Sequence, residues 1–269
     1  MAMLNSILFR APLFLLVYVR CFALIMTLPL FSMRSVSRVA KVAFAGYIAF
    51  FCFGTMDFSP YAPYISEDGV FSLLYILILI GEAAIGVITG FFVIIIFATF
   101  SSAGQFIAFQ MGFGAASAYD ALSQVENPLM GQFFNLVAML VFMQNHWFQK
   151  LFVGALRTSF SSLNSVSLAT AREGVIQFLL SGLSSLFANA LVIALPVMGT
   201  LFLITVCTGL LTKAAPQMNL LSEGFPVMIL VAFYVLAVVV PDLLNFFLAV
   251  FRDSFGELQR LFTRISGGI

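Results

Sequence analysis

Long apolar runs alternate with short polar breaks along this chain. A membrane-spanning helix needs about 20 consecutive apolar residues, and several runs reach or approach that length. The breaks between them hold prolines, glycines and charged residues, which stop helices and form turns. The apolar runs are 11–33, 42–56, 70–100, 129–145, 147–160, 175–211 and 225–251. This pattern predicts an all-α membrane protein. The run Ala11–Met33 is expected to be a retained first membrane helix, because no cleavage site follows a short apolar core.

Two of these runs are too long for simple membrane spans. As single helices, Val70–Phe100 and Val175–Leu211 would extend about 46 Å and about 55 Å at 1.5 Å per residue. The hydrocarbon core of a bilayer is only about 30 Å thick. Either these helices tilt steeply, or they fold into hairpins, or part of each is buried in protein. Their composition favours the last two alternatives.

Small and hydroxyl residues recur at helical spacing inside the two long runs. Gly86 and Gly90 form a small-xxx-small pair, and Ser181, Ser185 and Asn189 repeat every four residues on one helix face. Such faces allow close approach of helix backbones. Packing within the chain and packing onto partner subunits both remain open.

Composition supports the membrane prediction and narrows the partners. Of the 269 residues, 62% are hydrophobic and 9% are charged, whereas a soluble domain carries about 25% charged residues. The net charge of +1 gives no reason to expect a nucleic acid partner. The cysteines Cys21, Cys52 and Cys207 lie far apart inside apolar runs, so we expect small buried hydrophobes rather than a disulfide or metal ligands.

The distribution of basic residues gives a mixed topology. Arg34, Arg38 and Lys41 place the first loop in the cytoplasm by the positive-inside rule. The C-terminal tail, an expected short amphipathic segment at Arg252–Ile269, carries arginines and also prefers the cytoplasm. Six strict crossings would place that tail outside. Either the number of spans is not six, or some helices do not cross.

No catalytic, metal or cofactor constellation is apparent, so we expect neither an enzyme nor a bound cofactor. His146 is the single histidine, and it is expected in an interfacial turn beside Trp147. A metal site needs several ligands together. Gly112–Ser117 is a near miss to a dinucleotide fingerprint, but it lacks the third glycine and the βαβ context.

Two ionisable residues lie inside apolar runs. Arg20 and Glu82 would each cost about 2.5–3.5 kcal/mol at a membrane helix centre, so they must pair, face water or meet a partner. A proton or ion pathway, a buried pair and an inter-subunit contact all remain open. Asp242, which follows Pro241, is expected at a helix break near an interface.

A compact, weakly charged loop joins the last two runs into a hairpin at 212–226. Pro216 ends one helix, and Gly224 with Pro226 sets the start of the next. Contact with protein on the cytoplasmic side and a plain connector are both open. The loop residues singled out are Lys213, Pro216, Gln217, Met218, Asn219, Glu223 and Gly224.

Taken in order, these segments resemble the FliR family, whose virulence counterpart is called SctT. The string AAPQMN followed by EGFP resembles the family's hairpin loop. Arg20 with Pro29 resembles its first segment, GEAAIGVITG at Gly81–Gly90 its third, and AGQFIAFQMGFGAASAYD followed by Asn127–Pro128 its central region. One departure is the Asn145–His146 pair, where the family often has an intervening glycine.

The resemblance implies a subunit of a type III protein export gate in the bacterial inner membrane, within the flagellar basal body. It implies a FliP-like part at 1–174 followed by a FliQ-like hairpin part at 175–269, built of long, kinked helices. These parts would pack with FliP and FliQ subunits into a helical hetero-oligomer that contacts FlhB-like subunits, membrane lipid and unfolded export substrates. Much of that assembly is lifted out of the bilayer plane, which would account for the overlong runs.

The resemblance also implies that the segment before Asn127–Pro128 plugs the closed pore. The segment carries flexible glycines and adaptable apolar side chains, which suit a soft seal. The residues expected in the plug are Gln110, Met111, Gly112, Phe113, Gly114, Ala115, Ala116, Ser117 and Tyr119.

Two alternatives to a flagellar export gate stay open. The tripeptide Gly224–Pro226 favours the flagellar branch over the virulence branch of the same family. A secondary transporter that uses Arg20 and Glu82 is the rival from another class. Transporters often show internal inverted repeats, and no convincing repeat is present.

Overall fold

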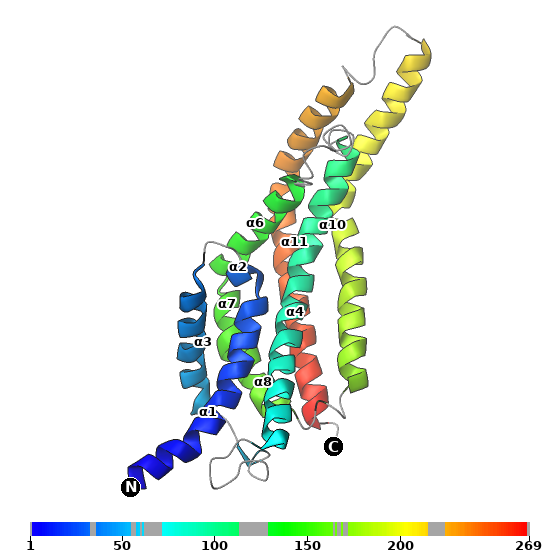
Figure 1. Cartoon of the computed structure of the whole chain (residues 1–269). Coiled ribbons are helices and arrows are strands. Elements are labelled where there is room, and N and C mark those ends of the chain that lie inside the picture. Colours follow the sequence, from blue (N-terminus) through cyan, green and yellow to red (C-terminus); the bar gives the residue numbers. More distant parts are fainter. Residues whose placement is uncertain are drawn as a thin grey trace. The chain divides into compact units, whose positions relative to one another are not determined.

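The computed structural model describes residues 2–32, 36–54, 58–59, 61, 72–112, 129–163, 165, 168, 172–214 and 224–267. Within these residues the secondary structure is helical throughout, which confirms the all-α prediction (Figure 1). The elements are α1 (Ala2–Thr27), α2 (Pro29–Ser32), α3 (Arg38–Phe53), α4 (Leu73–Gln110), α6 (Leu129–Gln144), α7 (Trp147–Gln149), the π-helix η2 (Lys150–Leu156), α8 (Arg157–Ser162), α10 (Arg172–Ala214) and α11 (Phe225–Gly267).

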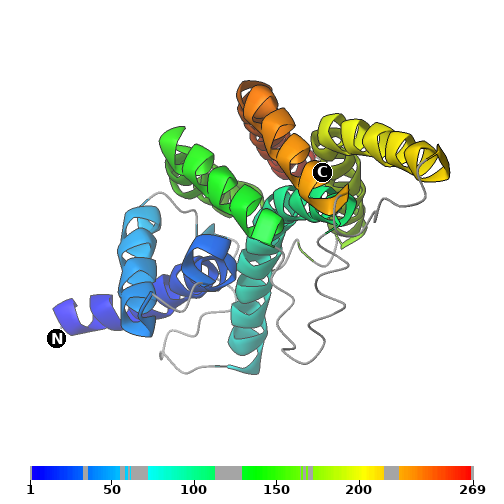
Figure 2. The ribbon, with the colours of Figure 1, turned by 90° about the horizontal axis from the view of Figure 1, so that it is seen from above.

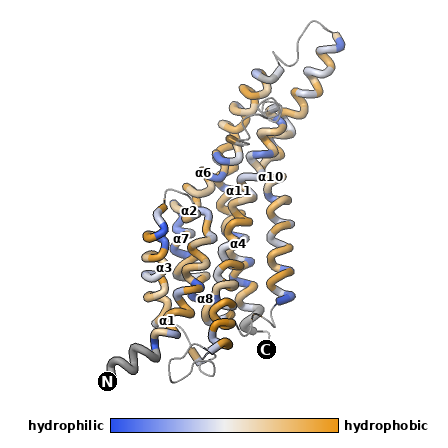
Figure 3. Tube along the Cα trace, viewed as in Figure 1, coloured by the Kyte–Doolittle hydropathy of each residue, from blue (hydrophilic) through white to orange (hydrophobic). Residues whose placement is uncertain are grey.

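Four of the described helices are long and apolar enough to cross a membrane. Their apolar stretches are Arg10–Thr27, Leu73–Gln110, Arg172–Ala214 and Pro226–Thr263. Figure 3 shows hydrophobic colouring along most of the long helices, with only scattered hydrophilic positions. The chain is therefore an all-α membrane protein.

The two overlong runs do not fold into hairpins, which excludes one of the alternatives that the sequence left open. α4 runs for 38 residues and α10 for 43 residues without a break. Pro196 lies inside α10, because one proline removes a single backbone hydrogen bond while the flanking apolar turns keep theirs. In an apolar environment a continuous helix also satisfies every other backbone group within the segment.

The last helix corrects two further expectations. Pro241 and Asp242 lie inside α11 rather than at a helix break. The segment after Arg252 continues α11 to Gly267 instead of forming a separate tail. Its charged positions follow the helical period, so the amphipathic character was predicted correctly but the boundary was not.

The fold divides into two compact units that share the long helices. Unit 1 contains residues 1–95, 145–182 and 253–269, and unit 2 contains residues 96–144 and 183–252. Each unit is described separately below.

In unit 1, α1 and α3 form an antiparallel pair, seen side by side in Figures 1 and 2. The Phe14 and Phe53 rings lie 5.8 Å apart near one end of the pair. Just beyond the C-terminal end of α1, the ring of Phe31 in α2 lies 5.3 Å from that of Phe44 in α3. Ser37 caps α3 by accepting a hydrogen bond from the Ala40 amide at 3.2 Å, which fixes where this helix begins.

Also in unit 1, α1 and α4 pack in parallel with a constant register. The Tyr75 hydroxyl donates to the Pro12 carbonyl at 2.8 Å, 63 positions away in sequence. Arg20 meets Glu82, 62 positions away. This fixed offset brings one face of α1 against one face of α4 for several turns.

In unit 2, a cluster of buried phenylalanines joins α4, α6 and α11. Ring centroids lie 4.3 Å apart for Phe100 and Phe247, and 5.4 Å apart for Phe142 and Phe251. The Phe cluster consists of Phe97, Phe100, Phe134, Phe142, Phe247 and Phe251, each at most 2% exposed. Tilted ring pairs of this kind contribute about 0.5–1.5 kcal/mol each beyond simple burial. The cluster is the core from which α4 extends toward the predicted plug.

Candidate functional site

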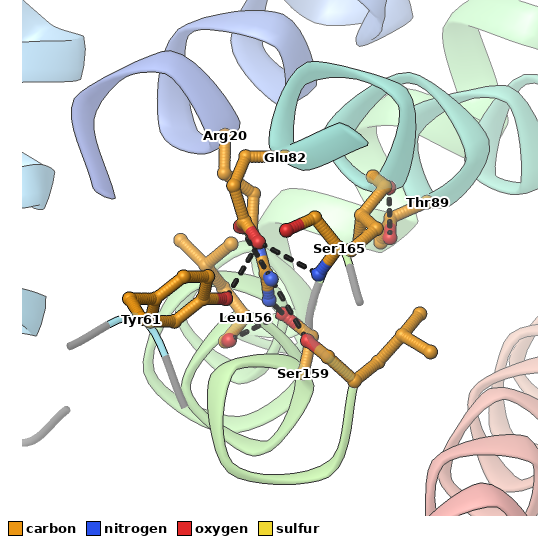
Figure 4. A network of polar contacts seen from close by, with 9 residues as sticks. Arg20, Tyr61, Glu82, Thr89, Leu156, Ser159 and Ser165 are labelled. Atoms are coloured by element: carbon orange, nitrogen blue, oxygen red, sulfur yellow. Dashed lines mark hydrogen bonds and ion pairs between the residues drawn. The ribbon is translucent and has the colours of Figure 1, made fainter. Parts of the chain in front are cut away.

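Arg20 of α1 and Glu82 of α4 form an ion pair inside unit 1, with both side chains 0% exposed (Figure 4). Arg20 Nε donates to Glu82 Oε2 at 2.7 Å, and Arg20 Nη2 lies 2.5 Å from the same oxygen. The sequence left open whether these residues meet, and the structure brings them together. A buried charge is tolerated only when it is paired and hydrogen-bonded, and both conditions hold here.

The remaining groups of the Arg20 guanidinium are satisfied by the end of α8. Arg20 Nη1 donates to Ser159 Oγ at 3.2 Å, and Nη2 donates to the Leu163 carbonyl at 2.8 Å. The Phe160 ring stacks against the guanidinium, with its centroid 4.2 Å from Arg20 Cζ. Arg20 is therefore held by α4 on one side and by the end of α8 on the other.

Glu82 has its own second set of donors. Its Oε1 accepts from the Tyr61 hydroxyl at 2.6 Å and from the Ser165 amide at 3.0 Å. Figure 4 shows the tyrosine and the serine converging on the carboxylate from different segments. We call Arg20, Tyr61, Glu82, Ser159 and Ser165, with the Leu163 carbonyl, the arginine clamp.

Tyr61 lies between α3 and α4, outside the spans, and its hydroxyl is kept neutral. Burial, followed by the negative charge of Glu82, raises the pKa of the Tyr61 hydroxyl well above its ordinary value of 10.0. The hydroxyl consequently remains a hydrogen-bond donor to the carboxylate over the whole physiological pH range.

The glycines of α4 let α1 approach closely enough for the clamp to close. A Cβ at Gly86 would lie 2.9 Å from the Ala23 Cβ, and one at Gly90 would lie 2.8 Å from the Thr27 Cβ. On the other side of Glu82, a Cβ at Gly81 would lie 2.6 Å from the Ser165 Cβ. The small-xxx-small pair therefore packs within the chain, which decides between the two alternatives left open by the sequence.

The polar groups of the Arg20–Glu82 ion pair all have partners within the clamp, and this limits the chemistry that the pair can perform. Both oxygens of Glu82 and all three nitrogens of the Arg20 guanidinium have partners within the described residues. A group that relays ions must exchange partners with water, and neither side chain is exposed. The arrangement favours a structural role, in which one buried pair fixes the positions of α1, α4, α8 and the Tyr61 segment.

The predicted plug begins at the end of α4, in unit 2. Gln110 is the last residue of α4 and Met111 is 0% exposed, so the plug has a fixed base. Gly112 follows with φ of 86°, a conformation that glycine adopts without steric cost. The other predicted plug residues, Phe113, Gly114, Ala115, Ala116, Ser117 and Tyr119, lie outside the described residues.

The return from the plug segment is held against α4. α6 begins at Leu129, and a Cβ at Gly104 of α4 would lie 2.6 Å from the Met130 carbonyl carbon. Asn135 Nδ2 of α6 donates to Ser101 Oγ of α4 at 3.0 Å. The two ends of the predicted plug are thus anchored on packed helices of one unit.

The hairpin loop is described only at its two ends. Lys213 belongs to the last turn of α10 rather than to the loop, where a cation complements the helix dipole. Gly224 directly precedes α11. The other loop predictions, Pro216, Gln217, Met218, Asn219 and Glu223, lie outside the described residues.

Two smaller predictions are settled by the structure. His146 is exposed, has φ of 57° and separates α6 from α7, so the predicted turn is confirmed. Cys207 is exposed on α10, which corrects the expectation that all three cysteines are buried.

The face carrying Ser181, Ser185 and Asn189 is only partly covered by the chain. Ser181 is exposed and donates to the Phe178 carbonyl of its own helix at 2.8 Å, while Ser185 and Asn189 are half-buried. Packing onto another subunit therefore stays a prediction for this face.

Sequence reasoning missed Tyr61, Ser159 and Ser165 as partners of the ion pair. Tyr61 and Ser165 lie in polar segments between apolar runs, and Ser159 lies at the end of the run 147–160. Nothing in the local pattern of these three residues marks them as partners of a buried charge. The fixed spacing of Glu82, Gly86 and Gly90 was a usable signal, because it places the carboxylate and the two glycines on one face of α4.

Comparison with known proteins identifies relatives over most of the chain. Residues 11–254 match the family of bacterial export proteins, family 1. The chain is 33% identical to the flagellar biosynthetic protein FliR of Bacillus subtilis (strain 168) over 237 residues, 87% of this chain and 88% of that protein. It is 30% identical to FliR of Pectobacterium carotovorum subsp. carotovorum over 256 residues, 93% and 92% of the two chains. It is also 29% identical to the surface presentation of antigens protein SpaR of Shigella flexneri over 169 residues, 63% and 64% of the two chains.

Proposed function

Since the chain belongs to the FliR family of flagellar biosynthetic and bacterial export proteins, we propose that it is a subunit of the flagellar type III export gate. In this proposal it assembles with FliP and FliQ subunits in the bacterial inner membrane, within the flagellar basal body, and contacts an FlhB-like subunit. Unfolded flagellar proteins pass through the channel that the subunits form together. The chain itself performs no catalysis and needs no cofactor.

The observation that carries the proposal is the length of the uncovered apolar surface on α10. Large apolar side chains are exposed from Ile176 to Leu211. At 1.5 Å per residue this surface extends about 53 Å, whereas the hydrocarbon core is about 30 Å thick. Fitting it into the bilayer alone would need a tilt of about 55°, and membrane helices tilt by about 0–40°.

The chain covers a much smaller share of the apolar surface of α10 and α11 than of α4. The most apolar stretch of α4 is 61% buried within the chain, whereas those of α10 and α11 are only 28% and 17% buried. Apolar surface that neither lipid nor this chain covers must be covered by protein, because exposure to water is unfavourable by about 25 cal/mol per Å². Partner subunits with long apolar helices supply that cover.

We assign the pore seal to the segment that begins at Gln110. Two observations support this assignment: the side chain of Met111 is buried at the base of the segment, and Gly112 has a φ of 86°, which departs from the α-helical conformation of α4. Both ends are fixed on α4 and α6, which meet at the Phe cluster.

The experiment that tests assembly uses side-chain size, because lipid and protein respond to it differently. Ala188 is exposed on α10 beside Phe187. A lipid-facing Ala188→Phe side chain is accommodated by mobile acyl chains, whereas a close-packed partner helix is displaced by it. We expect Ala188→Phe to keep its melting temperature in detergent but to copurify FliP and FliQ at least fivefold less well.

The matched control is Phe187→Trp, which keeps a large apolar side chain on the same turn. It should copurify both partners as the wild type does. Normal copurification and normal motility with Ala188→Phe would show that lipid, not protein, covers this face.

A second experiment tests the seal separately from assembly. A photo-crosslinker placed at Phe113 should react with an export substrate that a folded domain has stalled in the channel. Deleting Gly112–Ser117 should make the membrane permeable to ions while the complex still assembles. Unchanged permeability in an assembled complex would refute the assignment of the seal.

A further inference from the structure

We propose that the π-helix η2 contains one residue more than an α-helix with the same end contacts needs, and that η2 and the arginine clamp form a two-state device. While η2 holds the additional residue, Ser159 and Phe160 face Arg20. When η2 straightens to an α-helix at constant length, the same two side chains turn away and the clamp opens. All of these residues lie in unit 1.

η2 lies in the middle of one continuous helical segment. It spans Lys150–Leu156, seven residues, and follows α7 and precedes α8 without a break. The backbone of a π-helix bonds from residue i to i+5, so a turn holds more residues than an α-helical turn does. Such turns are rare inside α-helices and occur frequently at functional sites. η2 is therefore a feature that needs a physical reason.

The contacts at the two ends of this segment supply that reason. Near its start, the ring of Phe148 lies 6.0 Å from that of Phe44 in α3, and near its end the ring of Phe160 lies 4.2 Å from Arg20 Cζ in α1. α1 and α3 pack as a pair, so both ends of the segment face that pair. At about 3.6 residues per turn, positions 148 and 160 of an α-helix point about 120° apart, whereas one residue absorbed in a π-turn reduces this angle to about 20°.

Gly154 marks the place where η2 can hold the additional residue. It is exposed, and a Cβ added there would meet nothing within 4 Å, so a widened turn collides with no neighbour. Its carbonyl accepts from the Arg157 amide and from the Thr158 hydroxyl, the latter at 2.9 Å. The carbonyl at the junction between η2 and α8 is thus satisfied, as backbone groups in folded proteins generally are.

The Ser159 hydroxyl couples η2 to the clamp. Its Oγ donates to the carbonyl of Leu156, the last residue of η2, at 2.7 Å and accepts from Arg20 Nη1 at 3.2 Å. Straightening η2 at constant length rotates α8 by one residue, about 100°, which removes Ser159 and Phe160 from the guanidinium. Because Arg20 is 0% exposed and loses hydrogen-bond partners in that state, the closed clamp favours the π-helix.

Deletion of Gly154 in the full-length protein distinguishes this device from an ordinary packed helix. Removing one residue from an ordinary helix rotates everything after it by about 100°. Removing the additional residue of η2 instead leaves a regular α-helix whose side chains on both sides keep their directions. We therefore expect the deletion variant to fold and to melt in detergent at or above the temperature of the wild type.

A second substitution reads whether the clamp is still closed. Ser159→Ala should lower the melting temperature by roughly 3–12 °C, both in the wild type and in the deletion variant, because in both it removes a partner of the buried guanidinium. The matched control is Ser161→Ala, since Ser161 is exposed and its hydroxyl donates to the Thr158 carbonyl of its own helix. It should leave both melting temperatures almost unchanged.

The opening motion is measured by amide hydrogen exchange of residues 150–163, read by mass spectrometry. Exchange should be faster in Ser159→Ala than in the wild type, because a weakened clamp favours straightening. It should be slower in the deletion variant, in which the straightening motion no longer exists. Gly154→Ala keeps the length of the segment, so it should exchange nearly as the wild type does.

Three results would each overturn the proposal. The first is a deletion variant that fails to fold or melts well below the wild type, because the segment then behaves as an ordinary helix. The second is a Ser159→Ala substitution that costs no more than Ser161→Ala in the deletion variant. The third is exchange that is equal in the wild type and the deletion variant, or slowed as much by Gly154→Ala as by the deletion.

Discussion

Replacing Glu82 with glutamine removes the only anion that contacts the Arg20 guanidinium among the described residues. Breaking a buried ion pair by removing one partner costs about 3–5 kcal/mol, because the remaining charge stays buried. Arg20 is 0% exposed and is fixed from both sides, so it cannot reach water without opening the clamp. We therefore expect Glu82→Gln to destabilise the fold by about 3–5 kcal/mol.

Among the described residues, the converse change, Arg20→Met, leaves the Glu82 carboxylate with two donors, the Tyr61 hydroxyl and the Ser165 amide. We expect a similar cost of about 3–5 kcal/mol for the same reason. The double variant Arg20→Met/Glu82→Gln leaves no charge inside the arginine clamp. Its amide still accepts from Tyr61 and Ser165, so we expect it to be less destabilised than either single variant.

The assay is thermal unfolding in detergent, followed by the reaction of the buried thiol of Cys21 with a fluorogenic maleimide. For a chain of this size, 1 kcal/mol corresponds to about 2–4 °C in melting temperature. Each single variant should therefore melt about 6–20 °C below the wild type. Additive losses in the double variant would refute the reasoning, since they would show that the two charges do not interact.

Three further predictions follow from the packing and the charges. Gly86→Ala should lower the melting temperature or prevent folding, because the added methyl group would press on the backbone of α1. The control Gly199→Ala has open space around the added methyl group, so in the same assay it should be neutral or stabilising by up to about 1 kcal/mol. Phe251→Ala should cost about 2 kcal/mol or more through the cavity left in the Phe cluster, whereas Phe233→Ala, 52% exposed, should leave the melting temperature of the isolated chain almost unchanged. Because folding raises the pKa of the Tyr61 hydroxyl, its contribution to the stability of the fold is fully present below the unfolded pKa of 10.0 and is lost as the pH rises above that value. Tyr61→Phe should remove this loss of stability at alkaline pH. Equal pH dependence of the two proteins above pH 10 would contradict the assignment.

The sequence by itself determined the class of the protein and the position of its apolar helices. Apolar runs of spanning length with 9% charged residues leave no alternative to a membrane protein. The order of short motifs, such as GEAAIGVITG and AAPQMN, indicated the family that the comparisons confirm. Hydrophobic period and motif order are local properties, so they can be read without any knowledge of the fold.

Only the tertiary structure decided how these helices are used. Local pattern placed a break at Pro241 and left hairpins in the long runs as one alternative, yet the helices continue, because backbone hydrogen bonding in an apolar medium outweighs one proline or a few small residues. Whether Arg20 meets Glu82, and whether Gly86 packs inside the chain, depends on a register between α1 and α4 that no local pattern encodes.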